Sequence, residues 1–129
     1  MLDGTPSLIA EDQVFIALDL ALAVEDAGGM VVGPAASVEN ALALIESKPV
    51  AAAILDVNLT DGDITPVAMC LLEAGIPIII QSGVGAPTAL SAQYPDLVVY
   101  IKPYKISELM VKLENLLQFK SSSPSTSRV

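Results

Sequence analysis

The stretch Ala51-Ala52-Ala53-Ile54-Leu55-Asp56-Val57-Asn58-Leu59 decides the fold of this chain. Its run of small and branched apolar residues predicts a strand that is buried on both faces, as in a parallel sheet covered by helices. A carboxylate is costly inside such a strand, so Asp56 is expected at its end, on the rim of the sheet. In open α/β sheets, ligands bind at the rim formed by the carboxyl ends of the strands. Other functional side chains should therefore reach the same rim beside Asp56.

The composition narrows the class of protein. The chain has 129 residues, enough for one domain with a sizeable core, and 53% of them are apolar. No apolar run approaches the ~18 residues that cross a bilayer, and residues 1–11 lack the pattern of a signal peptide, so no membrane insertion and a cytoplasmic location are expected. The single cysteine, Cys70, fits a reducing compartment. Six basic residues against fifteen acidic ones make direct nucleic-acid binding unexpected.

Short apolar runs alternate with helical patterns along the chain. Strands are expected at 7–10, 30–32, 50–56, 76–80 and 97–101. Helices are expected at 14–26, after a cap at Ser37, at 67–73, around 86–92, and from Ile106 through Leu117, where the apolar spacing is clearest. A polar loop is expected at 60–66.

This alternation predicts an α/β fold of parallel βαβ units with right-handed crossovers. The expected architecture is flavodoxin-like, a (βα)5 doubly wound sheet of five parallel strands in the order 2-1-3-4-5. Residues 1–6 are expected as a lead-in, residues 7–118 as the domain, and the Ser-rich residues 119–129 as a disordered tail.

Polar side chains follow these strands on one rim. Glu11 and Asp12 follow the first strand, and Asp56 ends the third. Ser82 follows the fourth strand and Lys102 the fifth. The expected strand order sets the acidic pair directly beside Asp56, with Ser82 and Lys102 on the other side.

The chemistry of this set points to phosphoryl transfer. Neighbouring carboxylates repel one another, and a hard cation such as Mg²⁺ removes that conflict. Lys102 supplies a charge for a phosphate oxygen, and the Ser82 hydroxyl can donate to another. Asp56 can itself attack phosphorus, as carboxylates do in aspartyl-phosphate enzymes. These residue types together are what transfer of a phosphoryl group to an aspartate requires.

On these residues the chain resembles the receiver domain of response regulators, the CheY-like domain of two-component signalling, over roughly residues 7–118. Glu11-Asp12 matches the family's acidic pair, and the segment around Asp56 matches that of the phospho-acceptor. Ser82-Gly83 matches the Thr/Ser position, and Lys102-Pro103 matches the Lys-Pro pair. No one of these motifs is specific, but four of them in order at strand ends are.

The resemblance implies a role for each residue. Asp56 would take phosphate from a histidine kinase or phosphotransfer protein in a phosphorelay. Asp12, Asp56 and the backbone carbonyl of Asn58 would hold Mg²⁺, with Glu11 acting mainly through water. The Lys102-Pro103 peptide bond would be cis. The chain would be a phosphoryl acceptor rather than a turnover enzyme, either a stand-alone receiver or part of a longer protein.

Three positions depart from the family pattern. Val99 stands where the switch aromatic usually lies, and Tyr100, one residue later, would point to the other side of the strand. The loop after Asp56 carries Thr60 in place of a common Pro, and Lys105 replaces a helix-capping Asp. Signalling is therefore expected as a shift of the helix around 86–92 rather than as the burial of a ring.

The expected output surface combines that helix with the strand at 97–101 and the last helix. Its apolar side chains, Val99, Tyr100 and Val111 among them, are typical of a protein-binding face, for a downstream partner or a homodimer.

Two alternative functions stay open. Asp61-Gly62-Asp63-Ile64-Thr65 fits the DxDxT signature of haloacid-dehalogenase-like phosphatases, although that signature should follow a buried strand directly and the expected strand ends at Asp56. The second alternative is a binding-only pseudo-receiver, which the full set of acceptor, acidic pair, hydroxyl and lysine makes the weaker interpretation.

Overall fold

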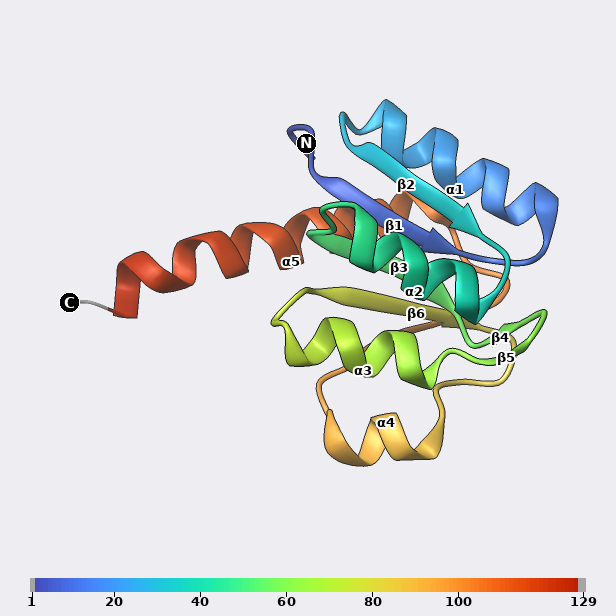
Figure 1. Ribbon diagram of the computed structural model, residues 1–129. Helices are drawn as coiled ribbons and strands as arrows, with labels where there is room; N and C mark the ends of the chain where they lie inside the picture. Colours follow the sequence, from blue (N-terminus) through green and yellow to red (C-terminus); the bar gives the residue numbers. More distant parts are fainter. Residues whose placement is uncertain (1, 128–129) are drawn as a thin grey trace.

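The computed structural model describes residues 2–127, with side-chain environments through residue 118. Five parallel strands form one sheet in the order β2-β1-β3-β6-β7 (Figure 1). Their bounds are β1 (Pro6–Ala10), β2 (Met30–Ala35), β3 (Ala52–Asp56), β6 (Ile78–Ser82) and β7 (Val98–Ile101). Counted along the chain within this sheet, that is the order 2-1-3-4-5, so the predicted flavodoxin-like α/β fold is confirmed.

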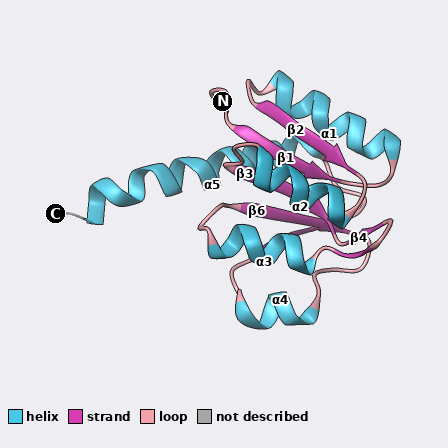
Figure 2. Cartoon of the chain, in the orientation of Figure 1, coloured by secondary structure: helices cyan, strands magenta, loops and turns pink. Residues whose placement is uncertain are grey.

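Helices cover both faces of this sheet (Figure 2). They are α1 (Val14–Asp26), α2 (Val38–Ser47), α3 (Thr65–Glu73), α4 (Thr88–Gln93) and α5 (Ile106–Ser127). Buried residues of α1 and α5 share one apolar cluster with one face of the sheet. Those of α2, α3 and α4 share a second cluster with the other face. Among residues 2–127 no helix has the length and apolar character needed to cross a membrane.

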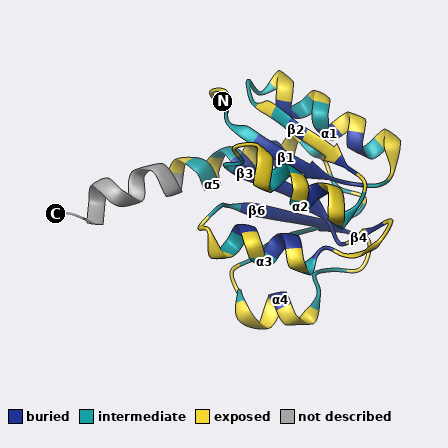
Figure 3. Cartoon of the chain, viewed as in Figure 1, coloured by how far each residue is buried: buried dark blue, intermediate teal, exposed yellow. Residues whose placement is uncertain are grey.

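The strand β3 lies in the middle of the sheet and is buried along its whole length (Figure 3). Successive side chains point to opposite faces of a strand. Ala52 and Ile54 accordingly pack in the α1/α5 layer, while Ala53 and Leu55 pack in the α2/α3/α4 layer. The prediction of a strand buried on both faces is confirmed, and Asp56 is its last residue.

The helices match their predicted positions closely. The helix α1 spans the predicted residues, and the Ser37 side chain caps α2 by accepting a hydrogen bond from the Asn40 N–H at 3.0 Å. The helix α3 begins at Thr65 rather than at Val67, because Pro66 is well suited to a first helical turn.

Two predictions about the segments after β3 are wrong. The fourth strand of the sheet, β6, was expected at 76–80 but runs to Ser82, which takes Gln81 and Ser82 into a fully buried strand. Each of these polar residues has a hydrogen-bonding partner there, and this makes its burial possible. The predicted polar loop at 60–66 is in part an antiparallel hairpin of β4 (Asn58–Leu59) and β5 (Gly62–Asp63). A hydrogen bond from Ile64 N to Val57 O, at 2.8 Å, closes its base.

The predicted disordered tail at 119–129 stays a prediction. The helix α5 is assigned through Ser127, whereas the side chains beyond 118 and the positions 128–129 lie outside the described residues.

We expect the core to be far more sensitive to truncation than the surface of α1. Ile79→Ala removes a fully buried side chain of β6 and should lower the free energy of unfolding by about 2–5 kcal/mol. Phe15→Ala is the matched control, since the Phe15 side chain is 83% exposed, and should change it by less than about 0.5 kcal/mol. Urea denaturation measures both, and equal losses in the two variants would contradict this packing.

Candidate functional site

The strand register brings four side chains into one row across the sheet. Ala10 pairs with Leu55, so Glu11 follows beside Asp56. Asp56 in turn pairs with Gln81, and Gln81 pairs with Tyr100 on β7. Paired residues on neighbouring strands point to the same face, so this row lies on the α1/α5 side of the sheet.

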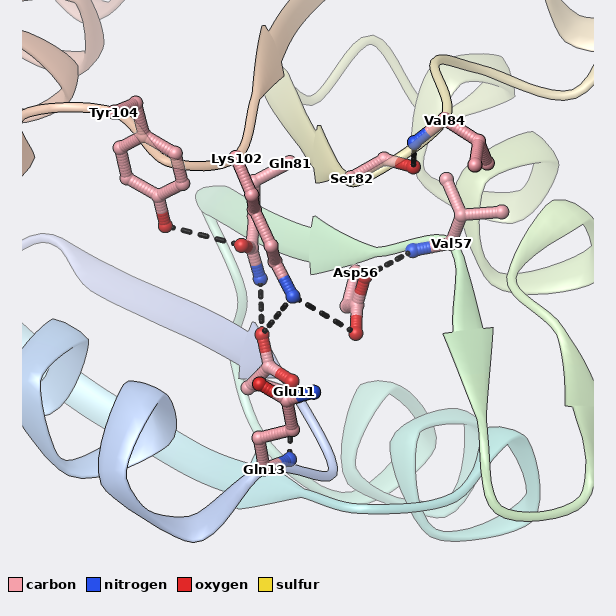
Figure 4. Close-up of polar contacts among 9 residues, drawn as sticks. All are labelled: Glu11, Gln13, Asp56, Val57, Gln81, Ser82, Val84, Lys102 and Tyr104. Carbon is pink, nitrogen blue, oxygen red and sulfur yellow. Dashed lines mark hydrogen bonds and ion pairs between the residues drawn. The ribbon is translucent and has the colours of Figure 1, made fainter.

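Lys102 crosses this row and contacts two carboxylates (Figure 4). Its Nζ lies 3.2 Å from Glu11 Oε1 and 3.4 Å from Asp56 Oδ2. The lysine is held in place through its backbone, which donates from N to Ser82 O at 2.8 Å, and its side chain is 21% exposed. The Lys102-Pro103 peptide bond is cis, as the resemblance implied. The lysine charge therefore stands between Glu11 and Asp56 and offsets their repulsion.

The two carboxylates have different acidities because their surroundings differ. Burial is the main cause that raises the pKa of Asp56 to about 6, and the negative charge of Glu11 raises it further. Lys102 and the Val57 N–H, which donates to Asp56 Oδ1 at 2.9 Å, only partly oppose this rise. Burial acts in the same sense on Glu11, but hydrogen bonds from the Gln81 amide and the Gln13 N–H outweigh it and hold the pKa of Glu11 below its usual value.

Asp12 completes a group of three carboxylates that suits a divalent cation. Ligand oxygens of Glu11, Asp12 and Asp56 lie within 4.8 Å of one another. Carboxylate oxygens are the ligands that Mg²⁺ prefers, and it uses one or two of them together with water and phosphate oxygens. Three carboxylates face the single charge of Lys102, so a cation would lower the electrostatic free energy of the site. The residues present therefore fit Mg²⁺.

The remaining predicted residues lie around this centre. Ser82 is buried at the end of β6, where its Oγ accepts a hydrogen bond from the Val84 N–H at 3.0 Å (Figure 4). Asn58 is exposed in β4 and pairs with Asp63 across the hairpin.

The sequence interpretation missed Gln81 and Tyr104. The Gln81 side chain is fully buried: its Nε2 donates to Glu11 Oε1 at 2.6 Å, and its Oε1 accepts from the Tyr104 hydroxyl at 3.0 Å. One available signal was the amide directly after three isoleucines, Ile78 to Ile80. Another was the tyrosine two residues after Lys102.

The carboxylates of Asp61 and Asp63, which suggested a phosphatase signature, accept hydrogen bonds at the first residues of α2 and α3. The Asp61 carboxylate accepts hydrogen bonds from the N–H groups of Val38 at 2.6 Å and Glu39 at 3.1 Å, so it ties the hairpin to the start of α2. These bonds lower the pKa of Asp61. Asp63 accepts from the N–H of Thr65 at 2.7 Å and from its hydroxyl, at the start of α3. Both are helix-capping contacts, and the phosphatase interpretation gains no support from them.

Comparison with known proteins gives structural neighbours only. The sequence matches no protein-family model, and it matches no curated protein. SdrG from Sphingomonas melonis Fr1 is 35% identical in sequence, and the match covers 91% of this chain and 99% of SdrG, with a TM-score of 0.74.

Two further solved structures, both of response regulators, are also similar to this chain. A CheY-like response regulator receiver domain protein from Methanospirillum hungatei JF-1 is 25% identical, with coverage of 92% of this chain and 98% of that one and a TM-score of 0.78. The response regulator PhyR from Brucella abortus is 27% identical, with a TM-score of 0.76. That match covers 94% of this chain and 52% of PhyR, so the chain spans about half of the PhyR chain.

The raised pKa of Asp56 predicts a specific pH dependence of stability. The folded state holds a proton on Asp56 up to about pH 6, above the ordinary value of 3.8, so ionisation of this group should destabilise the fold as the pH rises through that interval. Asp56→Asn should therefore be more stable than the wild type at neutral pH, by on the order of 2 kcal/mol, with little gain near pH 4.

Urea denaturation across this pH range measures the difference. Asp19→Asn, at an exposed acid on α1, is the control and should show no comparable gain. A stabilisation by Asp56→Asn that does not depend on pH would contradict the raised pKa.

Proposed function

The chain belongs to the receiver domains of response regulators, and from this premise we propose that Asp56 accepts a phosphoryl group from a histidine kinase or phosphotransfer protein. The observation that carries the proposal is the contact of Lys102 with Glu11 and Asp56 at the carboxyl ends of the strands. This contact supports the proposal, because it joins a carboxylate and an ammonium group at the rim where ligands bind in folds of this type. The proposed donors belong to the cytoplasm, and so, in this proposal, does the chain.

In the proposed step an oxygen of Asp56 forms a bond to phosphorus while the bond from phosphorus to the donor nitrogen breaks. The donor imidazole keeps the electron pair of that bond. The Val57 N–H keeps the carboxylate oriented through Oδ1, and the ammonium of Lys102, 3.4 Å from Oδ2, neutralises negative charge on the transferred group. Ser82 would exchange its bond from the Val84 N–H for a bond that its hydroxyl donates to a phosphoryl oxygen.

Mg²⁺ is the proposed cofactor, and when bound it supplies positive charge that neutralises the phosphoryl oxygens. Asp12, Asp56 and the backbone carbonyl of Asn58 are its proposed ligands. Glu11 is proposed to act through water, because its Oε1 already accepts hydrogen bonds from Gln81 and Lys102 and its Oε2 accepts one from the Gln13 N–H.

The phosphoryl donor is proposed to dock on α1. This helix begins two residues after Asp12 and carries large apolar side chains that are at least half exposed: Val14, Phe15, Leu18 and Leu22. Exposed apolar patches of this kind mark protein-binding surfaces.

The downstream partner, or a second copy of the chain, is proposed to bind the face formed by α4, β7 and α5. Val84, before α4, and Ile101 and Val111, on β7 and α5, are large exposed apolar residues. Val99 and Tyr100 are half-buried, so they contribute less surface than the sequence suggested. The helix α4 has six residues and buries only Leu90 among them, so few packing contacts oppose a shift of this helix.

The direct test of the proposal is covalent labelling. Treatment with acetyl phosphate and Mg²⁺ should add one phosphoryl group, detected by mass spectrometry of the intact protein and located at Asp56. Asp56→Asn should remain unlabelled, while Asp63→Asn, at the hairpin, should be labelled like the wild type. Labelling that persists in Asp56→Asn would refute the assignment. An unlabelled wild type that still binds Mg²⁺ would favour the pseudo-receiver.

Metal titration separates the roles of the acidic pair. Asp12→Ala should weaken Mg²⁺ binding more than Glu11→Ala does, because it removes a direct ligand rather than one that acts through water, by about 10-fold or more. Asp19→Ala, an exposed acid on α1, is the control for loss of overall charge. Equal weakening by the two site variants would show that both acids ligate directly or that neither does.

A further inference from the structure

Gln81 is an unexpected residue in its strand. It follows Ile78, Ile79 and Ile80 in the fully buried strand β6, between β3 and β7. Burying an amide costs free energy unless its polar atoms find partners, whereas an apolar side chain at this position would need none. A glutamine is therefore stable at this position only because its amide nitrogen and oxygen both have hydrogen-bonding partners.

Those partners connect two regions of the protein (Figure 4). The amide nitrogen donates to Glu11 Oε1 at 2.6 Å, inside the carboxylate site. The amide oxygen accepts at 3.0 Å from the hydroxyl of Tyr104, which lies on the loop between β7 and α5. Both ends of the planar Gln81 amide are thus hydrogen-bonded. If Glu11 moves, the amide must rotate and shift its bond to Tyr104, or a buried polar atom loses its partner.

The Glu11 end of this chain of hydrogen bonds is sensitive to the state of the site. Glu11 Oε1 is shared between Gln81 and Lys102, and Lys102 also reaches Asp56. Any group that draws Lys102 away from Glu11 leaves Gln81 as the remaining side-chain donor to that oxygen. The bond between Glu11 and Gln81 should therefore respond to occupation of the site.

The Tyr104 end lies at the surface. Tyr104 lines a groove together with Ile16 of α1, Pro103 and Ile106. Its ring packs edge-on against Tyr100, with centroids 6.0 Å apart. This groove is on the α1/α5 side of the sheet, whereas the usual switch position on β7 is occupied by Val99, which packs in the opposite layer.

We propose that Gln81 is a positioning residue that fixes Glu11 in the carboxylate site and couples the occupation of that site to Tyr104 in the groove between α1 and the β7–α5 loop. The proposal rests on the proposed function, since it takes phosphorylation of Asp56 as the event that redirects Lys102. It adds a second route to the surface, which does not depend on an aromatic residue at position 99.

Fluorine NMR of protein labelled with 3-fluorotyrosine tests this coupling. The chain has three tyrosines, so Tyr→Phe variants assign each signal. Addition of Mg²⁺ and beryllofluoride to the wild type should shift the Tyr104 signal. In Gln81→Met, an apolar replacement of similar shape, the Tyr104 shift should be lost at Mg²⁺ and beryllofluoride concentrations that still move the amide signal of Val57, which bonds Asp56. Tyr94, at the end of α4, reports separately on changes on the other side of the sheet.

The side-chain amide signal of Gln81 provides a second measurement that needs no variant at this buried position. It should move on addition of Mg²⁺ and beryllofluoride, and it should move in Tyr104→Phe without any ligand, because that change removes only the hydroxyl. A Tyr104 signal that stays still in the wild type, or that shifts equally in Gln81→Met, overturns the proposal even when Asp56 is labelled. A wild type that acetyl phosphate does not label at Asp56 is the separate result that refutes the proposed function.

Discussion

The contact of one lysine with two buried carboxylates is the interaction on which the site depends. Asp56 is 7% exposed and Glu11 is buried, so both would be unfavourable as free anions. Lys102 reaches both, at 3.4 Å and 3.2 Å, and its single charge cannot neutralise three acids once Asp12 is included. The site is thus left short of positive charge, and burial together with the negative charge of Glu11 raises the pKa of Asp56. A divalent cation bound at these carboxylates would reduce their mutual repulsion.

The fold produces this contact through strand register. Glu11, Asp56, Gln81 and Lys102 belong to four neighbouring parallel strands or the residues just after them, far apart in the sequence. Parallel strands bring their carboxyl ends to one edge, and alternation sends the paired side chains to one face. The apolar residues before each polar one fix that register, because a slip by one residue would turn the buried side chains of β3 away from their layers. The core and the site are therefore set by the same alternation.

The order of the strands and the polar residues at their ends could be predicted from the sequence for a physical reason. A buried parallel strand appears in the sequence as an apolar run that ends on a polar residue. This pattern predicted that Asp56 and Lys102 lie at strand ends. Gln81 was missed because a polar side chain after an apolar run indicates a strand end, and only the structure shows that Glu11 and Tyr104 satisfy it inside the strand. The hairpin of β4 and β5 was missed because its strands are only two residues long. It is anchored by Asp61, which accepts a hydrogen bond from the Val38 N–H at the start of α2, 23 positions away in the sequence. Contacts of that kind leave no periodic pattern in the sequence.

Asp56 sits in a buried site where three carboxylates face the single positive charge of Lys102. Carbon-13 NMR of the Asp56 side-chain carboxyl across a pH titration measures this directly. Without a divalent cation the midpoint should lie at about 6, well above the ordinary 3.8, because burial and Glu11 outweigh Lys102. With saturating Mg²⁺ the midpoint should fall, since a cation favours the ionised carboxylate. A midpoint in the ordinary range that Mg²⁺ leaves unchanged would contradict the account.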